Sequence, residues 1–220
     1  MISVPVSHRS AVLLIALVAA SCRTATTHGA DARPPIVQPG APGQPPHVIS
    51  AEQAADLSHV EFTPADVKFM QGMIGHHAQA LEMTALLATR TNSEDMRKLA
   101  SRIEISQADE IGMMKRWLQT RGQEVPSEHA HHINGATLMP GMLTPDEMSR
   151  LAAAKSREFD RLFLEYMIKH HAGALIMVRD LFATPGAAQE SEIFSFASDV
   201  DADQRMEIER MSNMLKELQQ

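Results

Sequence analysis

The sequence is poor in several residue types on which common functions depend. It has one cysteine in 220 residues, so an internal disulfide is excluded. Aromatic residues make up only 4% of the chain, although hydrophobic residues reach 44%, which is enough for a core. It has no G-x-S-x-G nucleophile motif and no glycine-rich phosphate loop. The sequence therefore gives no support for nucleophilic or acid–base catalysis.

Positive charge is also scarce. The formal net charge is −7 at pH 7, and no basic face is evident, which argues against a nucleic-acid partner. Methionine and histidine, by contrast, are abundant, with 15 and 11 residues. A single methionine is best explained as a flexible core residue. Here several methionines lie beside histidines, which favours a role in metal binding.

Residues 1–22 are typical of an export signal. The apolar run at 11–20 is too short to span a bilayer as a permanent helix. Cys22 follows Ala19-Ala20-Ser21, a pattern that indicates a bacterial lipobox with cleavage before the cysteine and acylation of Cys22. Ala19 stands where leucine is usual, so ordinary signal-peptidase cleavage is the alternative. We expect an exported protein of the periplasm or cell envelope, with a lipid anchor at Cys22.

Residues 23–60 carry four Pro-Pro or Pro-Gly pairs and few apolar residues. This composition predicts a disordered linker that is flexible or polyproline-like. The remaining residues, 61–220, have the length of one domain.

This domain contains an internal repeat. Residues 69–83 read FMQGMIGHHAQALEM, and residues 163–177 read FLEYMIKHHAGALIM. A second shared pattern, Q-x-x-E-I-x-x-M, follows each copy at 107–114 and 204–211. Two patterns repeated in the same order indicate a duplicated unit of two helices.

Start and stop signals for helices frame both units. Thr63-Pro64 opens the first helix, with Asp66 at the acidic position of a capping box, and Gly122 ends the second. Thr144-Pro145 opens a short helix in the central connection. No segment shows strand alternation. The prediction is an all-α four-helix bundle made of two repeated hairpins (63–121 and 157–220), joined by a connection at 122–156 that contains the extra helix.

Helical geometry brings the repeated polar residues together. His77 falls within the apolar face of its helix and His76 at its edge, and the second copy repeats this placement. The expected turns, near residue 92 and near 187–188, put His77 level with Gln107 and His171 level with Gln204. Glu110 and Glu207 then lie one turn away. We expect these four side chains to orient the histidine rings: Gln107, Glu110, Gln204 and Glu207.

The repeated M-I-x-H-H-x-x-A helix, the Q-x-x-E-I pattern and the M-P-G-M-L segment between the halves resemble the domain of unknown function 305 (DUF305) family, over about residues 62–218. The resemblance implies a ferritin-like fold, and some exported members are associated with copper binding and copper resistance. The metal ligands that it implies are Met73, His76, His77, Met83, Met167, His170, His171 and Met177, with Met139 and Met142 in M-P-G-M. The chain departs from a symmetric pattern at Trp117 versus Met214 and at Met70 versus Leu164.

Thioether and imidazole are the ligands that copper(I) favours. A single inward histidine is best explained by a hydrogen bond to a buried glutamine or glutamate, but two symmetric pairs, each beside methionine, favour a metal. A separate cluster in the connection is either a weak metal site or a solvated loop. It contains His129, His131, His132, Met139 and Met142. Asp66 is explained as a helix cap, and the sequence gives its counterpart Asp160 no role.

The expected function is to sequester or transfer copper(I), or silver(I), in copper tolerance, with a protein donor or acceptor as partner. The first alternative is an enzyme, a ferritin-like di-metal oxidase or peroxide-handling protein that binds iron or another divalent metal through His and Glu. Methionine, not glutamate, stands three residues before His76 and His170, which disfavours this alternative. The second alternative is a structural or partner-binding module without metal.

Overall fold

The computed structural model describes residues 34–38, 45–56, 60–129 and 138–219, which fall into two units that divide after Ala55. The predicted export signal, including Cys22, lies outside the described residues. None of the helices in the described ranges combines the length and apolar character needed to cross a bilayer.

The first unit contains a short β-hairpin and one helical turn. Strands β1 (Ile36–Gln38) and β2 (His47–Ile49) pair antiparallel, and helix α1 (Ala51–Ala55) follows. Ile36 pairs with Ile49 and Val37 with Val48, and such pairs of β-branched residues stabilise a hairpin. These three short segments of regular structure lie within the predicted linker.

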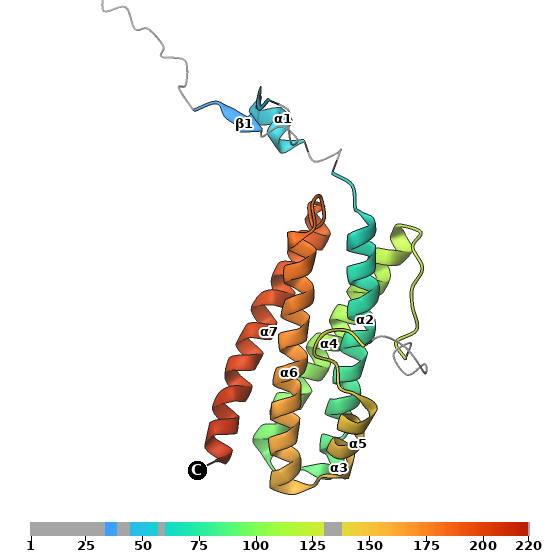
Figure 1. The fold of residues 1–220 in the computed structure, drawn as a ribbon, viewed down its shortest axis with the longest axis vertical. Helices are drawn as coiled ribbons and strands as arrows, with labels where there is room; N and C mark the ends of the chain where they lie inside the picture. The colour runs from blue at the N-terminus through green and yellow to red at the C-terminus, as the bar shows by residue number, and fades with distance from the viewer. Residues whose placement is uncertain (1–33, 39–44, 57–59, 130–137, 220) are drawn as a thin grey trace, which may run out of the picture. The chain divides into compact units, whose positions relative to one another are not determined.

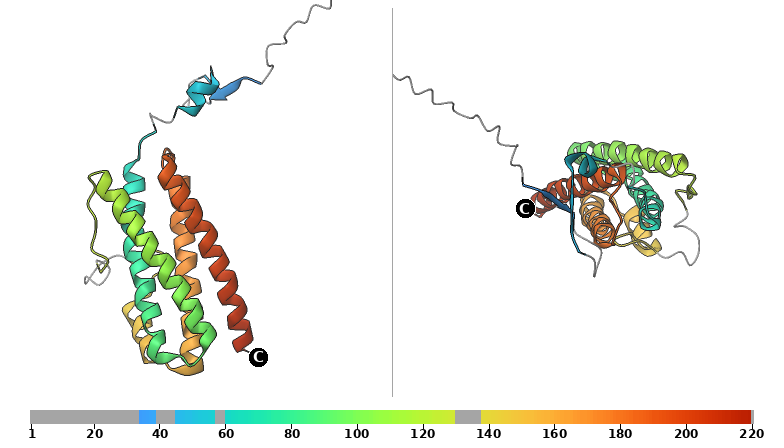
Figure 2. Two further views of the ribbon diagram at one scale, coloured as in Figure 1. Left: turned by 180° about the vertical axis from the view of Figure 1, so that it is seen from behind. Right: turned by 90° about the horizontal axis from the view of Figure 1, so that it is seen from above.

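The second unit is an all-α bundle, as predicted (Figure 1). Its helices are α2 (Pro64–Ala85), α3 (Leu87–Arg90), α4 (Glu94–Thr120), α5 (Pro145–Ala153), α6 (Ser156–Ala183) and α7 (Ser191–Leu218). Helix α2 packs against α4, α6 packs against α7, and the two hairpins meet where α2 contacts α6 (Figures 1 and 2). Helices α2 and α6 run in opposite directions.

The helix ends follow from local sequence. The capping box predicted at Thr63 and Asp66 is present, with Asp66 accepting from the Thr63 backbone N–H at 2.7 Å. Thr144 and Glu147 form a second capping box at the start of α5. Gly122 has φ of +64° just after α4, a left-handed conformation that glycine adopts without steric cost.

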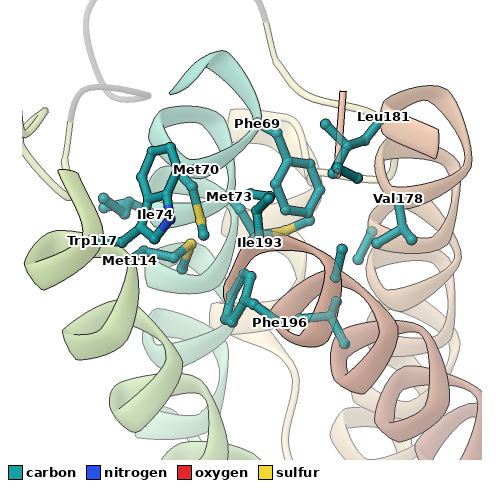
Figure 3. Packing of buried hydrophobic residues seen from close by; sticks show 14 of the residues in the cluster. Phe69, Met70, Met73, Ile74, Met114, Trp117, Val178, Leu181, Ile193 and Phe196 are labelled. Carbon is teal, nitrogen blue, oxygen red and sulfur yellow. The ribbon is translucent and has the colours of Figure 1, made fainter. Parts of the chain in front are cut away.

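Two apolar clusters fill the bundle on either side of its middle. The first contains Phe69, Met73, Trp117 and Phe196 (Figure 3). The second contains Met83, Leu99, Phe163 and Met167 among others. Since α2 contributes its first half to one cluster and its last turns to the other, the histidines lie at the boundary between them.

The repeated aspartates connect the hairpins at opposite ends. Besides its cap contacts, Asp66 Oδ1 accepts a hydrogen bond at 2.7 Å from the backbone N–H of Ala188, in the turn between α6 and α7. Asp160, the equivalent residue in α6, hydrogen-bonds to Thr91 in the turn between α3 and α4. Burial raises the pKa of Asp160, and the contacts with Thr91 and Arg97 oppose that shift. Each repeat therefore holds the turn of the other, which gives Asp160 the role that the sequence left unassigned.

Candidate metal centre

Four histidine rings form a row through the middle of the bundle. The centroids of His76 and His170 lie 3.8 Å apart across the α2–α6 contact, with their planes inclined by 36°. Within each pair the centroids are 6.2 Å apart. All four residues are at most 1% exposed. The contact between the two pairs is made by His76 and His170, which come from different repeats.

Carboxylates hold the two ends of the row. His77 Nε2 donates to Glu110 of α4, and His171 Nε2 donates to Glu207 of α7 at 2.5 Å. A carboxylate oxygen can only accept, so Nε2 carries the proton and Nδ1 keeps its lone pair when the ring is neutral. Neither Nδ1 has a hydrogen-bond partner among the described residues. These two rings therefore present a buried nitrogen lone pair, as metal-binding histidines do.

His170 differs from the other three histidines because neither of its ring nitrogens makes a well-formed hydrogen bond in the described part of the chain, although a weaker contact with the backbone of His76 slightly opposes the lowering of its pKa. Burial, followed by repulsion from His76, His171 and His77, holds the pKa of His170 well below its ordinary value of 6.5. The imidazole is therefore neutral near pH 7. A buried nitrogen without a partner normally costs stability, and a bound metal ion would remove that cost.

Glu110 and Glu207 both lie close enough to Asp203 of α7 to affect its ionisation. Burial raises the pKa of Glu110, but the hydrogen bonds and charge of His77 and the hydrogen bond from Ser106 more than offset this, so the net shift is downward. Burial and the negative charges of Glu110 and Glu207 raise the pKa of Asp203 on α7. Glu110 is therefore ionised at neutral pH, in the state that accepts the imidazole N–H.

The glutamines of the second repeated pattern are buried but do not hold the histidines by hydrogen bonds through Oε1. Gln107 and Gln204 are 1% and 2% exposed, and their Oε1 atoms have no hydrogen-bond partner within the described ranges. Of the four side chains predicted to orient the histidines, Glu110 and Glu207 hydrogen-bond to them, and the two glutamines do not.

The four predicted methionine ligands flank the row on both sides. Met73 and Met167 each precede a histidine of the row by three residues, so they lie within one helical turn of it. Met83 and Met177 follow the histidines by six or seven residues, which places them about 10 Å along the helix axis. The eight predicted ligands therefore extend along the helices, and Met73 and Met167 are the methionines of the set that lie closest to the histidines in the sequence.

The M-P-G-M-L segment is fixed against both central helices. His76 Nε2 donates to the backbone carbonyl of Pro140 at 3.0 Å. The Gln79 side chain makes two hydrogen bonds with the backbone of Leu143, at 2.7 and 3.0 Å. On α6, Gly173 lies against the backbone of Gly141, which has φ of +76°. The segment thereby orients a third imidazole of the row.

The family follows from the sequence match. The family described as "Domain of unknown function (DUF305)" matches residues 66–215, which include both copies of the repeat. The chain belongs to the DUF305 family.

Solved structures of DUF305 proteins are similar to this chain. A DUF305 protein described as secreted, from Streptomyces coelicolor, is 30% identical, with a TM-score of 0.62 over 70% of this chain and 93% of that one. A DUF305 fragment from Deinococcus radiodurans is 31% identical, with a TM-score of 0.61 over 71% and 98%. CopM in its Cu(I)-bound form is 26% identical, with a TM-score of 0.55 over 71% and 98%. CopM has also been solved with Cu(II), with silver and in the apo form. No curated protein sequence matches the chain.

CopM, a structural relative of this chain, thus binds metal ions. In this chain, the side chains that could donate to a metal limit which ions could bind. Among the described side chains, no three histidine, cysteine, aspartate or glutamate residues are placed to hold one metal ion. A ferritin-like di-iron centre needs several such ligands. The described residues do not supply such a set, and the imidazoles of the row are donors that suit a softer ion.

The second candidate cluster is only partly described. His131 and His132 lie outside the described residues. His129 is exposed and lies 3.4 Å from Glu82 of α2, whereas Met142 is buried at 4% exposure. Met139 lies against Gly72, beside Met177. The described members of the predicted cluster therefore lie in different surroundings.

Proposed function

We propose that this protein binds copper(I), or silver(I), in the cell envelope, and that it sequesters the ion or passes it to a partner protein. The ligands are the imidazoles of the row together with Met73 and Met167. The observation that carries the proposal is the row itself: four buried rings, three of which (His76, His77 and His171) donate Nε2–H to an oxygen acceptor.

The donor chemistry supports a soft monovalent ion. Imidazole and thioether are uncharged, and they suit copper(I) better than the hard cations that need several oxygen ligands. Met73 and Met167 are fully buried on either side of the row. Binding there would exclude water and satisfy nitrogen atoms such as those of His170. CopM, a relative solved with Cu(I) and with silver, supports the same assignment.

A competition titration tests the proposal. The chain carrying Cys22→Ser, so that no free thiol competes, is titrated with copper(I) against a chromogenic chelator. We expect the wild-type site to compete, the His76→Leu/His170→Leu variant to lose this competition, and Met73→Leu/Met167→Leu to weaken it. Met96→Leu is the control, because Met96 is also buried but lies in the first turn of α4, fourteen residues before Glu110. Absence of competition by wild type would refute the proposal.

Thermal unfolding gives an independent measure. A ligand that binds only the folded state stabilises it by about 2.7 kcal/mol at 100 times its dissociation constant. We expect copper(I) and silver(I) to raise the melting temperature of wild type, and to have a much smaller effect on the His76→Leu/His170→Leu variant. Equal shifts in both proteins would assign the binding to other residues.

The cellular location is part of the proposal. The lipobox-like sequence before Cys22 favours an exported lipoprotein, and a relative described as secreted supports export. Fractionation of cells that express wild type and Cys22→Ser tests the anchor. We expect wild type in the membrane fraction and the variant in the soluble envelope fraction. Recovery of wild-type protein in the soluble fraction would argue for ordinary signal-peptidase cleavage.

A further inference from the structure

Met139 and Met177 converge on one point at the surface of the bundle. A Cβ atom built on Gly72 would lie 3.5 Å from Met139 Sδ and 3.5 Å from Met177 Cε. The two thioethers thus come from the M-P-G-M-L segment and from α6, and they meet over the one residue of α2 that leaves room for them. Neither belongs to the imidazole row, since Met177 lies seven residues beyond His170.

This pair lines an open pocket. The pocket has a volume of about 380 Å³, and its walls include Lys68, Phe69, Met139, Pro140, Met177 and Asp180. Met139 and Met177 are both half-buried. The repeat equivalent of Met177 is Met83, which is fully buried at 0% exposure. The duplicated motif therefore brings a methionine to the surface in only one of its two copies.

The position of Met139 is determined by the contacts of its neighbours. Pro140 accepts the hydrogen bond from His76, and Gly141 packs against Gly173. Gln79 holds the backbone of Leu143. A methionine on a free loop would sample many positions. Here the backbone on the C-terminal side of Met139 is fixed by three contacts, so Met139 is held beside Met177.

We propose that Met139 and Met177 form a second, accessible site for a soft monovalent metal ion, distinct from the buried row, at which copper(I) or silver(I) first binds and from which it exchanges. This inference rests on the proposed function for the identity of the ion. Two uncharged thioethers bind such an ion without a proton or redox change, and with fewer donors than the row they bind it more weakly. The pocket wall carries one positive group, Lys68, and one negative group, Asp180, so it neither repels nor traps a cation.

Silver(I) titration of protein labelled with [methyl-13C]methionine tests this site directly. The full chain after signal removal, carrying Cys22→Ser, is used, and the Met139 and Met177 methyl signals are assigned from single Met→Leu variants. We expect both signals to shift together on adding silver(I), and Met139→Leu/Met177→Leu to bind one equivalent less than wild type. Met113→Leu/Met206→Leu is the control, since these methionines are exposed but lie elsewhere.

The outcomes separate the two proposals. If the Met139 and Met177 signals stay unchanged while silver(I) binds with the same stoichiometry in wild type and Met139→Leu/Met177→Leu, the second site is refuted and the imidazole row stands. If the protein binds no silver(I) and no copper(I), the proposed function fails. Circular dichroism of the double variant checks folding, and the wild-type methyl shifts do not depend on any variant.

Discussion

Gly173 lies so close to Pro140 that a Cβ atom on the glycine would overlap the proline carbonyl oxygen. This carbonyl is the acceptor for His76. The glycine in α6 is therefore required for the connecting segment to reach the histidine row.

Gly173→Ala should destabilise the protein in spite of the better helix propensity of alanine. Overpacking of a tight contact costs about 1–3 kcal/mol, and the displaced segment also loses its contact with His76. Gly75→Ala is the matched control, because no atom lies within 4 Å of a Cβ built there. We expect Gly75→Ala to be neutral or stabilising by up to about 1 kcal/mol. Chemical denaturation measures both, and equal effects would contradict the tight contact.

Asp66→Ala should be among the more damaging polar substitutions. It removes a helix cap, worth about 1 kcal/mol, and leaves the buried N–H of Ala188 unsatisfied, at about 1–3 kcal/mol. We expect a loss of about 2–4 kcal/mol in the free energy of unfolding. Glu147→Ala, at the capping box of α5, should cost less than about 1 kcal/mol because that box is more exposed and holds no second turn. A similar cost for both would show that the contact with Ala188 contributes little.

The stability of the folded protein should fall below pH 6.5. Because burial lowers the pKa of His170 in the folded chain, the unfolded chain binds a proton below pH 6.5 that the folded chain does not. The contribution of this group is then complete above pH 6.5 and declines by up to about 1.4 kcal/mol for each pH unit below it. The lowered pKa of Glu110 contributes stability that is complete above its ordinary value of 4.5 and is lost only below that value.

Urea denaturation of metal-free protein at pH 7.5 and pH 5.5 measures this dependence. His170→Leu should show a shallower decline than wild type. An identical slope in wild type and His170→Leu would mean that His170 does not resist protonation in the folded protein.

Glu110→Gln and Glu207→Gln should each weaken copper(I) binding about 10- to 100-fold, because a carboxylate that accepts the N–H of a metal-binding histidine fixes the ring and raises its basicity. The amide keeps the size of the side chain, so folding should be retained. Glu165→Gln is the control, since Glu165 pairs with Arg161 on the surface of α6. Unchanged affinity in both variants would show that the row does not bind the ion through His77 and His171.

The helices could be predicted because their ends are encoded locally. Thr63, Ser93 and Thr144 all cap helices through their own side chains. The contact between the two histidine pairs followed from the repeat, since equivalent apolar faces pack against each other in a duplicated hairpin.

The positions of the Cα atoms along the two antiparallel helices predicted that His77 would lie opposite Gln107. They could not predict that His77 pairs with Glu110. Side chains lean toward the N-terminus of their own helix. In an antiparallel hairpin, His77 therefore leans away from the turn and Glu110 leans toward it, so the two meet although their Cα atoms lie one turn apart in level. The same lean brings His171 to Glu207.

The surroundings of Met139 were also beyond prediction. Its neighbours in the sequence, His129 to His132, suggested a common cluster, but its contact with Met177 depends on where the connecting segment crosses α2 and α6. That path is set by long-range contacts, such as those of Gln79 with Leu143, which local sequence patterns do not reveal.

Gln79 and Gly173 occupy equivalent positions in the two copies of the motif. Gln79 binds the connecting segment through its side chain, whereas Gly173 leaves room for the backbone of that segment. Glutamine at 173 would collide with the segment, and glycine at 79 would release it. The two copies of the motif therefore cannot carry the same residue at this position. A change that made the two copies identical here would disrupt the packing of the connecting segment. The difference at this position follows from the single connecting segment, which only one copy can accommodate closely, whereas the histidines occupy equivalent positions in both copies.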